Sequence, residues 1–297
     1  MLKTFSLCVL VVLINSSNGY GQSTNKEAEA ALTKGINADK NKDFNSAIIN
    51  YTKAIELDPK YVTAYKNRGN AYYDLKKYPE AIADYSKAID LDPSFVDAYY
   101  NRGTMYSNLK KYPEAIADYS KAIELDPSFV DAYYNRGEAY ADLKKYPEAI
   151  ADFTKAIELD PKYVFAYYNR GIAYRNLNKY LEAIVDYTKA IELDPKYVFA
   201  YYNRGIAYGN LEKYSKAIAD FTKAIELDPK YVRAYNNRGS AYGNLEKYPE
   251  AIADFTKVIE LNPKDASAYY NRGITYKALG KTKEAEVDFA KAKSLEK

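Results

Sequence analysis

The strongest constraint on this chain is an internal period of 34 residues. The triplet Asn-Arg-Gly recurs at this spacing, and its glycines are Gly69, Gly103, Gly137, Gly171, Gly205, Gly239 and Gly273. Gly35 lies one further period upstream, where the triplet reads Thr33-Lys34-Gly35. A period of this length predicts an array of small structural units that each pack on their neighbours.

Each period contains two helical patterns. The first runs over about residues 62–75 and has apolar or aromatic residues at spacings of three and four, and the second runs over about residues 79–91. Pro79 suits the first turn of a helix. Asp92-Pro93 ends the second helix, because proline cannot continue the hydrogen-bond ladder. Each repeat is therefore predicted to form one helical hairpin.

These residues resemble the tetratricopeptide repeat (TPR), which combines Gly-x-x-Tyr, Ala-x-x-x-Phe/Tyr-x-x-Ala and a proline within its period. The resemblance covers residues 28–297, in repeats that start near residues 28, 62, 96, 130, 164, 198, 232 and 266. It implies an all-α fold, a right-handed superhelical solenoid of hairpins whose concave groove is lined by the first helix of each repeat. Most of the 35 tyrosines are then expected to pack within the hairpins, with their rings buried and their hydroxyls near water.

The last repeat differs from the others on one face of its second helix. Repeats one to seven carry two isoleucines seven residues apart, as at Ile252 and Ile259, and the last repeat has Glu286 and Lys293 there. Terminal repeats need a polar outer face, so both side chains are expected to be exposed.

A second pattern links the two helices of each hairpin. Wherever the triplet is Asn-Arg-Gly, an aspartate follows 15 residues after the glycine, as Asp84 follows Gly69. In the first repeat the arginine is replaced by Lys34 and the aspartate by Asn50. We therefore expect an ion pair between the arginine and the aspartate, for example between Arg68 and Asp84. The alternative is that near-identical repeats simply share every residue.

Four positions of the first helix vary between repeats, although the alanine five residues before the glycine never changes. They lie six and three residues before the glycine and one and four after it, so they share one helix face, which the resemblance places in the groove. This face is acidic in repeats three and four, aromatic and apolar in repeats five and six, and polar in repeat seven. The candidate binding residues are Asp97, Tyr100, Asp131, Tyr134, Glu138, Phe165, Tyr168, Ile172, Phe199, Tyr202, Ile206, Arg233 and Asn236.

A ligand that matches this face is an extended or helical protein segment with a basic part and a bulky apolar part. The alternative is that Phe165 and Phe199 only pack against neighbouring helices.

Some TPR proteins are co-chaperones whose carboxylate clamp binds the acidic C-terminus of a heat-shock chaperone. Lys66, Asn70 and Asn101 match the first three clamp residues. Asp131 and Asn135 stand where the clamp needs lysine and arginine, and an aspartate repels a carboxylate. This function is therefore disfavoured.

The composition argues against an enzyme. The chain has no histidine, and its one cysteine is Cys8, so it lacks the commonest general base, the commonest transition-metal ligand and any disulfide. Lysines and glutamates recur once per repeat on outward helix faces, and no glycine-rich phosphate loop is present. We expect no catalytic residue, no cofactor and no metal. The net charge of only +3 argues against a nucleic-acid partner.

The first 21 residues match a secretory signal peptide, with a basic start, an apolar run over residues 7–14 and small residues near the end. Cleavage is expected before Gln22, followed by a short linker over residues 22–27. The apolar run is far shorter than the roughly 20 residues that a membrane-spanning helix needs. We expect an exported protein, periplasmic or extracellular, that does not insert into a membrane after cleavage.

Together these patterns predict a non-enzymatic scaffold that binds a protein or peptide through its concave face. The alternative is a structural solenoid that associates with itself, for example as a homodimer. Repeat architecture serves many unrelated processes, so it does not identify the partner.

Overall fold

The computed structural model describes residues 23–295, which form sixteen α-helices and no strand. Within each of its two compact units, successive helices pack against one another in chain order. The all-α fold of tandem hairpins expected from the sequence is therefore confirmed. The predicted signal peptide lies outside the described residues.

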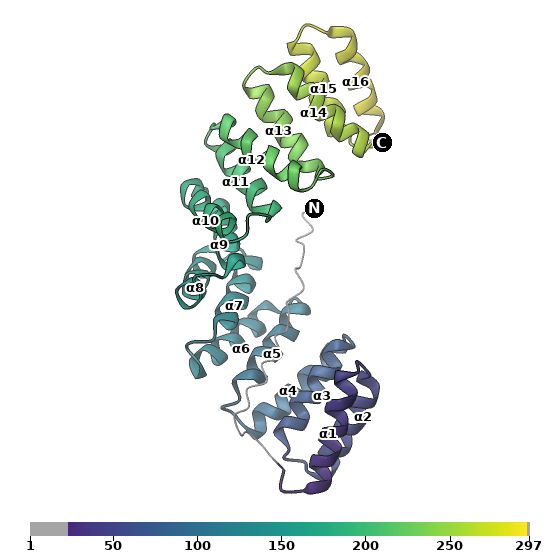
Figure 1. The fold of residues 1–297 in the computed structure, drawn as a ribbon, viewed down its shortest axis with the longest axis vertical. Helices are drawn as coiled ribbons and strands as arrows, with labels where there is room; N and C mark the ends of the chain where they lie inside the picture. The colour runs from purple at the N-terminus through teal and green to yellow at the C-terminus, as the bar shows by residue number, and fades with distance from the viewer. Residues whose placement is uncertain (1–22, 296–297) are drawn as a thin grey trace. The chain divides into compact units, whose positions relative to one another are not determined.

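The chain divides into two compact units at the boundary between Lys110 and Lys111. The helices of the first unit are α1 (Lys26–Lys40), α2 (Phe44–Leu57), α3 (Val62–Asp74), α4 (Tyr78–Leu91) and α5 (Val96–Asn108). The helices of the second unit are α6 (Tyr112–Leu125), α7 (Val130–Asp142), α8 (Tyr146–Leu159), α9 (Val164–Asn176), α10 (Tyr180–Leu193), α11 (Val198–Asn210), α12 (Tyr214–Leu227), α13 (Val232–Asn244), α14 (Tyr248–Leu261), α15 (Ala266–Ala278) and α16 (Thr282–Leu295). Within the second unit, the hairpins stack in chain order from α7/α8 to α15/α16 (Figure 1).

Helix ends follow the local signals in each repeat. The second helix α4 begins at Tyr78 with Pro79 in its first turn, where the missing amide hydrogen costs nothing. It ends at Leu91, and the next residue, Asp92, has an extended φ of −139° and ψ of 92°, as expected for a residue before proline.

The turn inside each hairpin closes the first helix with a left-handed residue. After α3 the amide of Lys77 donates to the Tyr72 carbonyl at 2.8 Å, and the amide of Lys76 donates to the Tyr73 carbonyl at 2.7 Å. Lys76 has a φ of 58° and occupies the left-handed position of this Schellman-type motif, where glycine is usually found. Only the last described hairpin has glycine at this position, Gly280, so tertiary packing imposes the turn on the other repeats.

Small residues and one large ring form the core of each hairpin. Alanines of both helices are almost fully buried, and one aromatic residue of the second helix, such as Tyr85 or Tyr187, lies between them. The glycine of the triplet makes room for this ring. A Cβ atom at Gly171 would lie 2.7 Å from a ring carbon of Tyr187, so the close helix approach requires glycine there.

The arginine of the triplet joins neighbouring hairpins. Arg136 donates from Nε and Nη2 to the two carboxylate oxygens of Asp152 at 2.8 and 2.7 Å, which confirms the expected pair. Its Nη1 donates to the Ser120 hydroxyl of the preceding second helix, α6, at 2.9 Å, and its guanidinium lies over the Tyr133 ring. The same carboxylate pair occurs in Arg68–Asp84, Arg170–Asp186, Arg204–Asp220, Arg238–Asp254 and Arg272–Asp288.

The asparagine of the triplet joins neighbouring first helices. Asn169 donates to the Tyr134 hydroxyl of the preceding hairpin at 2.7 Å, and the pairs Asn203–Tyr168 and Asn237–Tyr202 repeat this contact at 2.9 and 3.1 Å. The hydroxyl of Tyr85, which the sequence predicted to lie near water, is instead buried and donates to the side-chain oxygen of Asn70 at 2.7 Å. Each residue of the triplet thus has its own structural contact.

At the last described hairpin, Glu286 and Lys293 of α16 are exposed, as predicted. None of the helices in the described range is long and apolar enough to cross a membrane.

Candidate protein-binding face

In the second unit, the first helices of successive hairpins lie next to one another and form one continuous face. Contacts join α7 to α9, α9 to α11, α11 to α13, and α13 to α15. We call this surface the first-helix face. All the predicted binding residues lie on it except Asp97 and Tyr100, which belong to α5 of the first unit.

Neither candidate of the first unit is freely exposed. The carboxylate of Asp97 forms an ion pair with Lys66 at 3.3 Å, and Tyr100 is buried. The acidic stretch predicted for repeats three and four is therefore reduced to hairpin four. The same contact engages Lys66, the first residue of the disfavoured carboxylate clamp.

A continuous series of rings crosses hairpins four to seven, which we call the aromatic ladder. Ring centroids are separated by 4.9 Å from Tyr134 to Tyr163, 6.4 Å from Tyr163 to Phe165, 5.9 Å from Phe165 to Tyr197, 6.1 Å from Tyr197 to Phe199 and 5.9 Å from Phe199 to Tyr231. The four contacts that involve Phe165 or Phe199 are edge-to-face, the geometry that aromatic pairs prefer. The rings therefore hold one another in place.

The rings of the first-helix face differ in their access to solvent. Tyr134 is buried and Tyr168 and Tyr202 are half-buried, so these tyrosines contribute mainly to the floor of the face. Phe165 and Phe199 are both 36% exposed although their edges are packed. They combine the two roles that the sequence left as alternatives, because each packs on neighbouring rings and also presents apolar surface.

The acidic end of the face lies on α7. The Tyr134 hydroxyl donates to Oε1 of Glu138 at 3.0 Å, and Asn169 donates to the same oxygen at 3.3 Å. Burial raises the pKa of Glu138 to about 7. The Tyr163 hydroxyl donates to Asp131 at 3.2 Å, and burial raises the pKa of Asp131. Neither carboxylate forms an ion pair within the part of the chain that the structure describes.

Further along, the face becomes apolar and then basic. Ile172 and Ile206 are half-buried, and Ile172 packs in the core cluster of hairpin five. Arg175 donates to the side-chain oxygen of Asn203 at 2.8 Å. Arg233 is exposed, and Asn236 accepts a hydrogen bond from Asn271 at 3.4 Å. The face therefore runs from carboxylates on α7 to guanidinium groups on α9 and α13.

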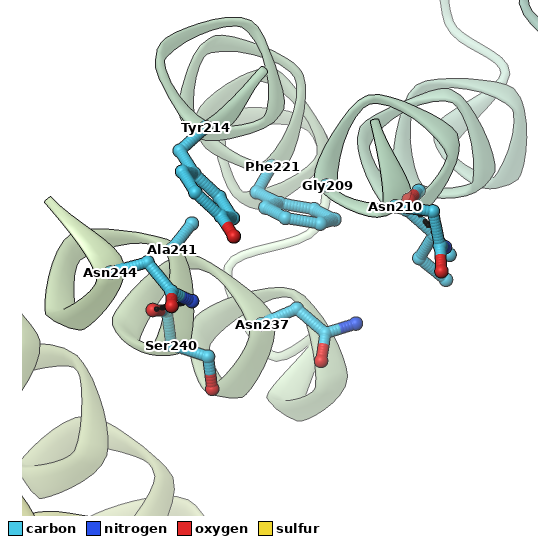
Figure 2. Close-up of a pocket in the computed structure, with 9 residues that line it drawn as sticks. Gly209, Asn210, Tyr214, Phe221, Asn237, Ser240, Ala241 and Asn244 are labelled. Atoms are coloured by element: carbon cyan, nitrogen blue, oxygen red, sulfur yellow. Dashed lines mark hydrogen bonds between the residues drawn. The ribbon is translucent and has the colours of Figure 1, made fainter. Parts of the chain in front are cut away.

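An open pocket of 280 Å³ lies between α11, α12 and α13. Figure 2 shows Tyr214 and Phe221 of α12 on one side and the polar residues Asn237, Ser240 and Asn244 of α13 on the other. Gly209 lines it, and nothing lies within 4 Å of where its Cβ atom would be. At the same position hairpin five carries Arg175, so the loss of a side chain opens the pocket in hairpin six.

Among residues 23–295 there is no cluster of three or more side chains suited to hold a metal ion. The groups that donate hydrogen bonds to Glu138 and Asp131 are phenols and an amide.

Sequence reasoning missed the residues that precede each first helix. Tyr163, Tyr197 and Tyr231 connect the rings of neighbouring hairpins, yet they lie outside the four variable positions. A signal was present, because an aromatic residue stands eight residues before the triplet glycine in repeats two to seven.

Three models of repeat families together match most of the chain. One described as "TPR repeat" matches residues 40–76, 69–110 and 103–144. Models described as "Tetratricopeptide repeat" match residues 130–163, 164–197, 198–231, 232–265 and 255–287.

Known proteins resemble the chain in parts. It is 49% identical over 41 residues to Stress-induced-phosphoprotein 1 of Caenorhabditis elegans, a stretch that spans 14% of this chain and 13% of that protein. The crystal structure of YrrB, described as a TPR protein with an unusual peptide-binding site, is 30% identical, has a TM-score of 0.57, and covers 62% of this chain and 95% of its own. A tetratricopeptide repeat protein from Parabacteroides merdae, 23% identical with a TM-score of 0.61, covers 87% of this chain and 99% of its own and shares the fold.

Proposed function

The chain belongs to the tetratricopeptide repeat family, a fold of protein-interaction scaffolds, and on this premise we propose that it binds a segment of a partner protein along its first-helix face, without catalysis. The observation that carries the proposal is the aromatic ladder, in which Phe165 and Phe199 present apolar surface that the scaffold itself does not cover. Aromatic side chains held rigidly at low entropic cost are typical anchors of protein interfaces.

The scaffold does not need these phenylalanines. The same position carries Asp97 in hairpin three and Asp131 in hairpin four, and hairpin seven has Arg233. Two consecutive phenylalanines in otherwise near-identical repeats therefore favour recognition of a bulky apolar group. YrrB, which resembles 62% of this chain, is described as having a peptide-binding site, and this supports the class of ligand.

The proposal is tested by selecting random linear peptides on the protein and measuring the affinity of the selected peptides by titration. The double variant Phe165→Asp/Phe199→Asp uses the residue that hairpin four tolerates at this position and should lose binding at unchanged helicity. The control variant, Leu181→Ser/Val185→Ala, removes apolar side chains that are 60% and 68% exposed on α10, and hairpin six supplies the replacement residues. Loss of binding in the control variant alone would place the partner on the second helices. If the wild type sediments as a dimer and the control variant as a monomer, self-association through α10 would be favoured instead.

We also propose that the protein is exported, on the composition of residues 1–21. N-terminal sequencing of the protein from its native source should begin at Gln22. An intact Met1 on the mature protein would refute export by this route.

A further inference from the structure

One carboxylate on the first-helix face is not required by the fold. At the position of Glu138, directly after the triplet glycine, hairpins two to eight otherwise carry Asn70, Thr104, Ile172, Ile206, Ser240 and Ile274. Hairpins five and six place isoleucine there, and Ile172 packs in the core of its hairpin. A partly buried carboxylate in this environment is less favourable than isoleucine, because burial penalises the charged form. The scaffold therefore loses stability by carrying Glu138.

The structure supplies this carboxylate with hydrogen bonds and no positive charge. Tyr134 and Asn169 both bond to Oε1, and the residues that the structure describes offer no hydrogen bond or ion pair to Oε2. The charged and titratable groups that act on Glu138 are acids or phenols: Asp142 on the same helix, and Tyr163 and Tyr197 before α9 and α11.

The basic groups on the neighbouring elements are engaged elsewhere. Arg136 of α7 is bound to Asp152 of α8 and to Ser120 of α6, and Arg175 of α9 donates to Asn203. Tyr112 of α6 contacts Asp142, which adds another neutral group. None of the groups that shift the pKa of Glu138 is basic, and a cation is the charge that complements this carboxylate.

Aromatic rings border the same carboxylate. Tyr134, which bonds to Glu138, contacts the Tyr163 ring, and Tyr163 leads to the exposed Phe165. A cation within about 6 Å of a ring face is attracted by the ring quadrupole. The aliphatic stem of a lysine or arginine can lie along such rings while its charged group reaches a carboxylate.

We propose that Glu138, Tyr134 and Tyr163 form a subsite for one lysine or arginine side chain of the partner segment, adjacent to the apolar anchor at Phe165. This inference rests on the proposed function, because the cationic side chain belongs to the segment bound along the first-helix face. The subsite sets the register of that segment, since it holds the cation at the α7 end and the bulky apolar group over α9 and α11.

The test selects random linear peptides on the wild-type protein and on Glu138→Gln, Glu138→Ile and Glu148→Gln. Glu138→Ile introduces the residue of hairpins five and six, and Glu148→Gln removes an exposed carboxylate at the start of α8. Peptides selected by the wild type should share a lysine or arginine at a fixed distance from a bulky apolar residue. Glu138→Gln should bind them about tenfold more weakly or worse, and replacement of the basic residue by glutamine should cost little further affinity in that variant. Glu148→Gln should bind as the wild type does.

The outcomes separate the two proposals. Peptides that bind the wild type through Phe165 and Phe199 without any basic residue would overturn the cation subsite and leave the proposed function intact. An unchanged preference for lysine or arginine in both Glu138 variants would likewise overturn the subsite. If no peptide binds the wild type, both proposals fail.

Discussion

The hydroxyl of Tyr187 offers a sharp test of the packing inside the hairpins. This side chain of α10 is fully buried against Gly171, and its hydroxyl has no hydrogen-bond partner among the described residues. Burial raises the pKa of Tyr187. Hairpins four, six, seven and eight have phenylalanine at the equivalent position, so the scaffold accepts a ring without the hydroxyl.

The change Tyr187→Phe should therefore stabilise the protein. A buried polar group without a partner costs about 1–3 kcal/mol, and its removal leaves the ring and its contacts in place. We expect a gain of about 1–2 kcal/mol, because part of the penalty is offset by the dispersion contacts that the oxygen atom makes. In urea unfolding followed by circular dichroism, the midpoint should rise at an unchanged slope.

The matched control is Tyr85→Phe in the first unit. The Tyr85 hydroxyl donates to the side-chain oxygen of Asn70 at 2.7 Å, and both residues are buried. Its removal leaves the Asn70 oxygen unpaired, so this variant should lose about 1–2 kcal/mol. Opposite signs for the same chemical change would support the reasoning. If Tyr187→Phe were destabilising, its hydroxyl would have to be satisfied by a buried water, and the argument would be refuted.

Three further predictions concern the scaffold and the face. Gly209→Ala should stabilise the protein by about 1 kcal/mol, because this helical glycine has open space where its Cβ atom would be. Gly171→Ala should instead destabilise it by about 1–3 kcal/mol, because its methyl group would lie 2.7 Å from a ring carbon of Tyr187. Equal effects of the two changes in urea unfolding would refute the role of the triplet glycine. Arg136→Ala and Asp152→Ala should each cost about 3–5 kcal/mol, with the double variant no worse than either, and strict additivity would contradict the pair. Because burial raises the pKa of Glu138 to about 7, ionisation of Glu138 lowers the stability of the folded state progressively as the pH rises from its ordinary pKa towards 7. The free energy of unfolding of the wild type relative to Glu138→Gln should therefore fall by about 3 kcal/mol over this range, and a difference independent of pH would refute the assignment.

The period and its local signals were sufficient to predict the hairpins. Proline in the first turn of the second helix and Asp-Pro at its end act within a few residues, so one sequence shows them directly. The Arg–Asp pair was also predictable, because the first repeat lacks both partners and carries Lys34 and Asn50 instead. The contact between Arg136 and Ser120 of the preceding hairpin was not predicted, since a comparison within one repeat does not show what the next hairpin touches.

The turn and the face show where local reasoning stops. Lys76 takes a left-handed conformation that its own preferences disfavour, because the packing of both helices decides the turn. For the face, helical periodicity selected residues that, apart from Asp97 and Tyr100, lie on the first helices of the second unit, but it could not rank their exposure. Tyr134 and Phe165 lie on the same stripe, yet one is buried under its neighbours and the other is 36% exposed.

Because the repeats are near-identical, equivalent positions can be compared between them, and each repeat serves as a control for the others. The triplet fixes each hairpin, with asparagine bound to the preceding first helix, arginine to two second helices and glycine to the ring of its own hairpin. Variation at other positions is then free to serve a ligand, and variation that lowers stability is the most informative. Glu138 is such a case, because a partly buried carboxylate replaces a residue that hairpins five and six fill with isoleucine. A partner that brings a positive charge offsets this loss of stability only in the bound state. The unfavourable burial of Glu138 in the free protein therefore makes binding selective for a cationic segment.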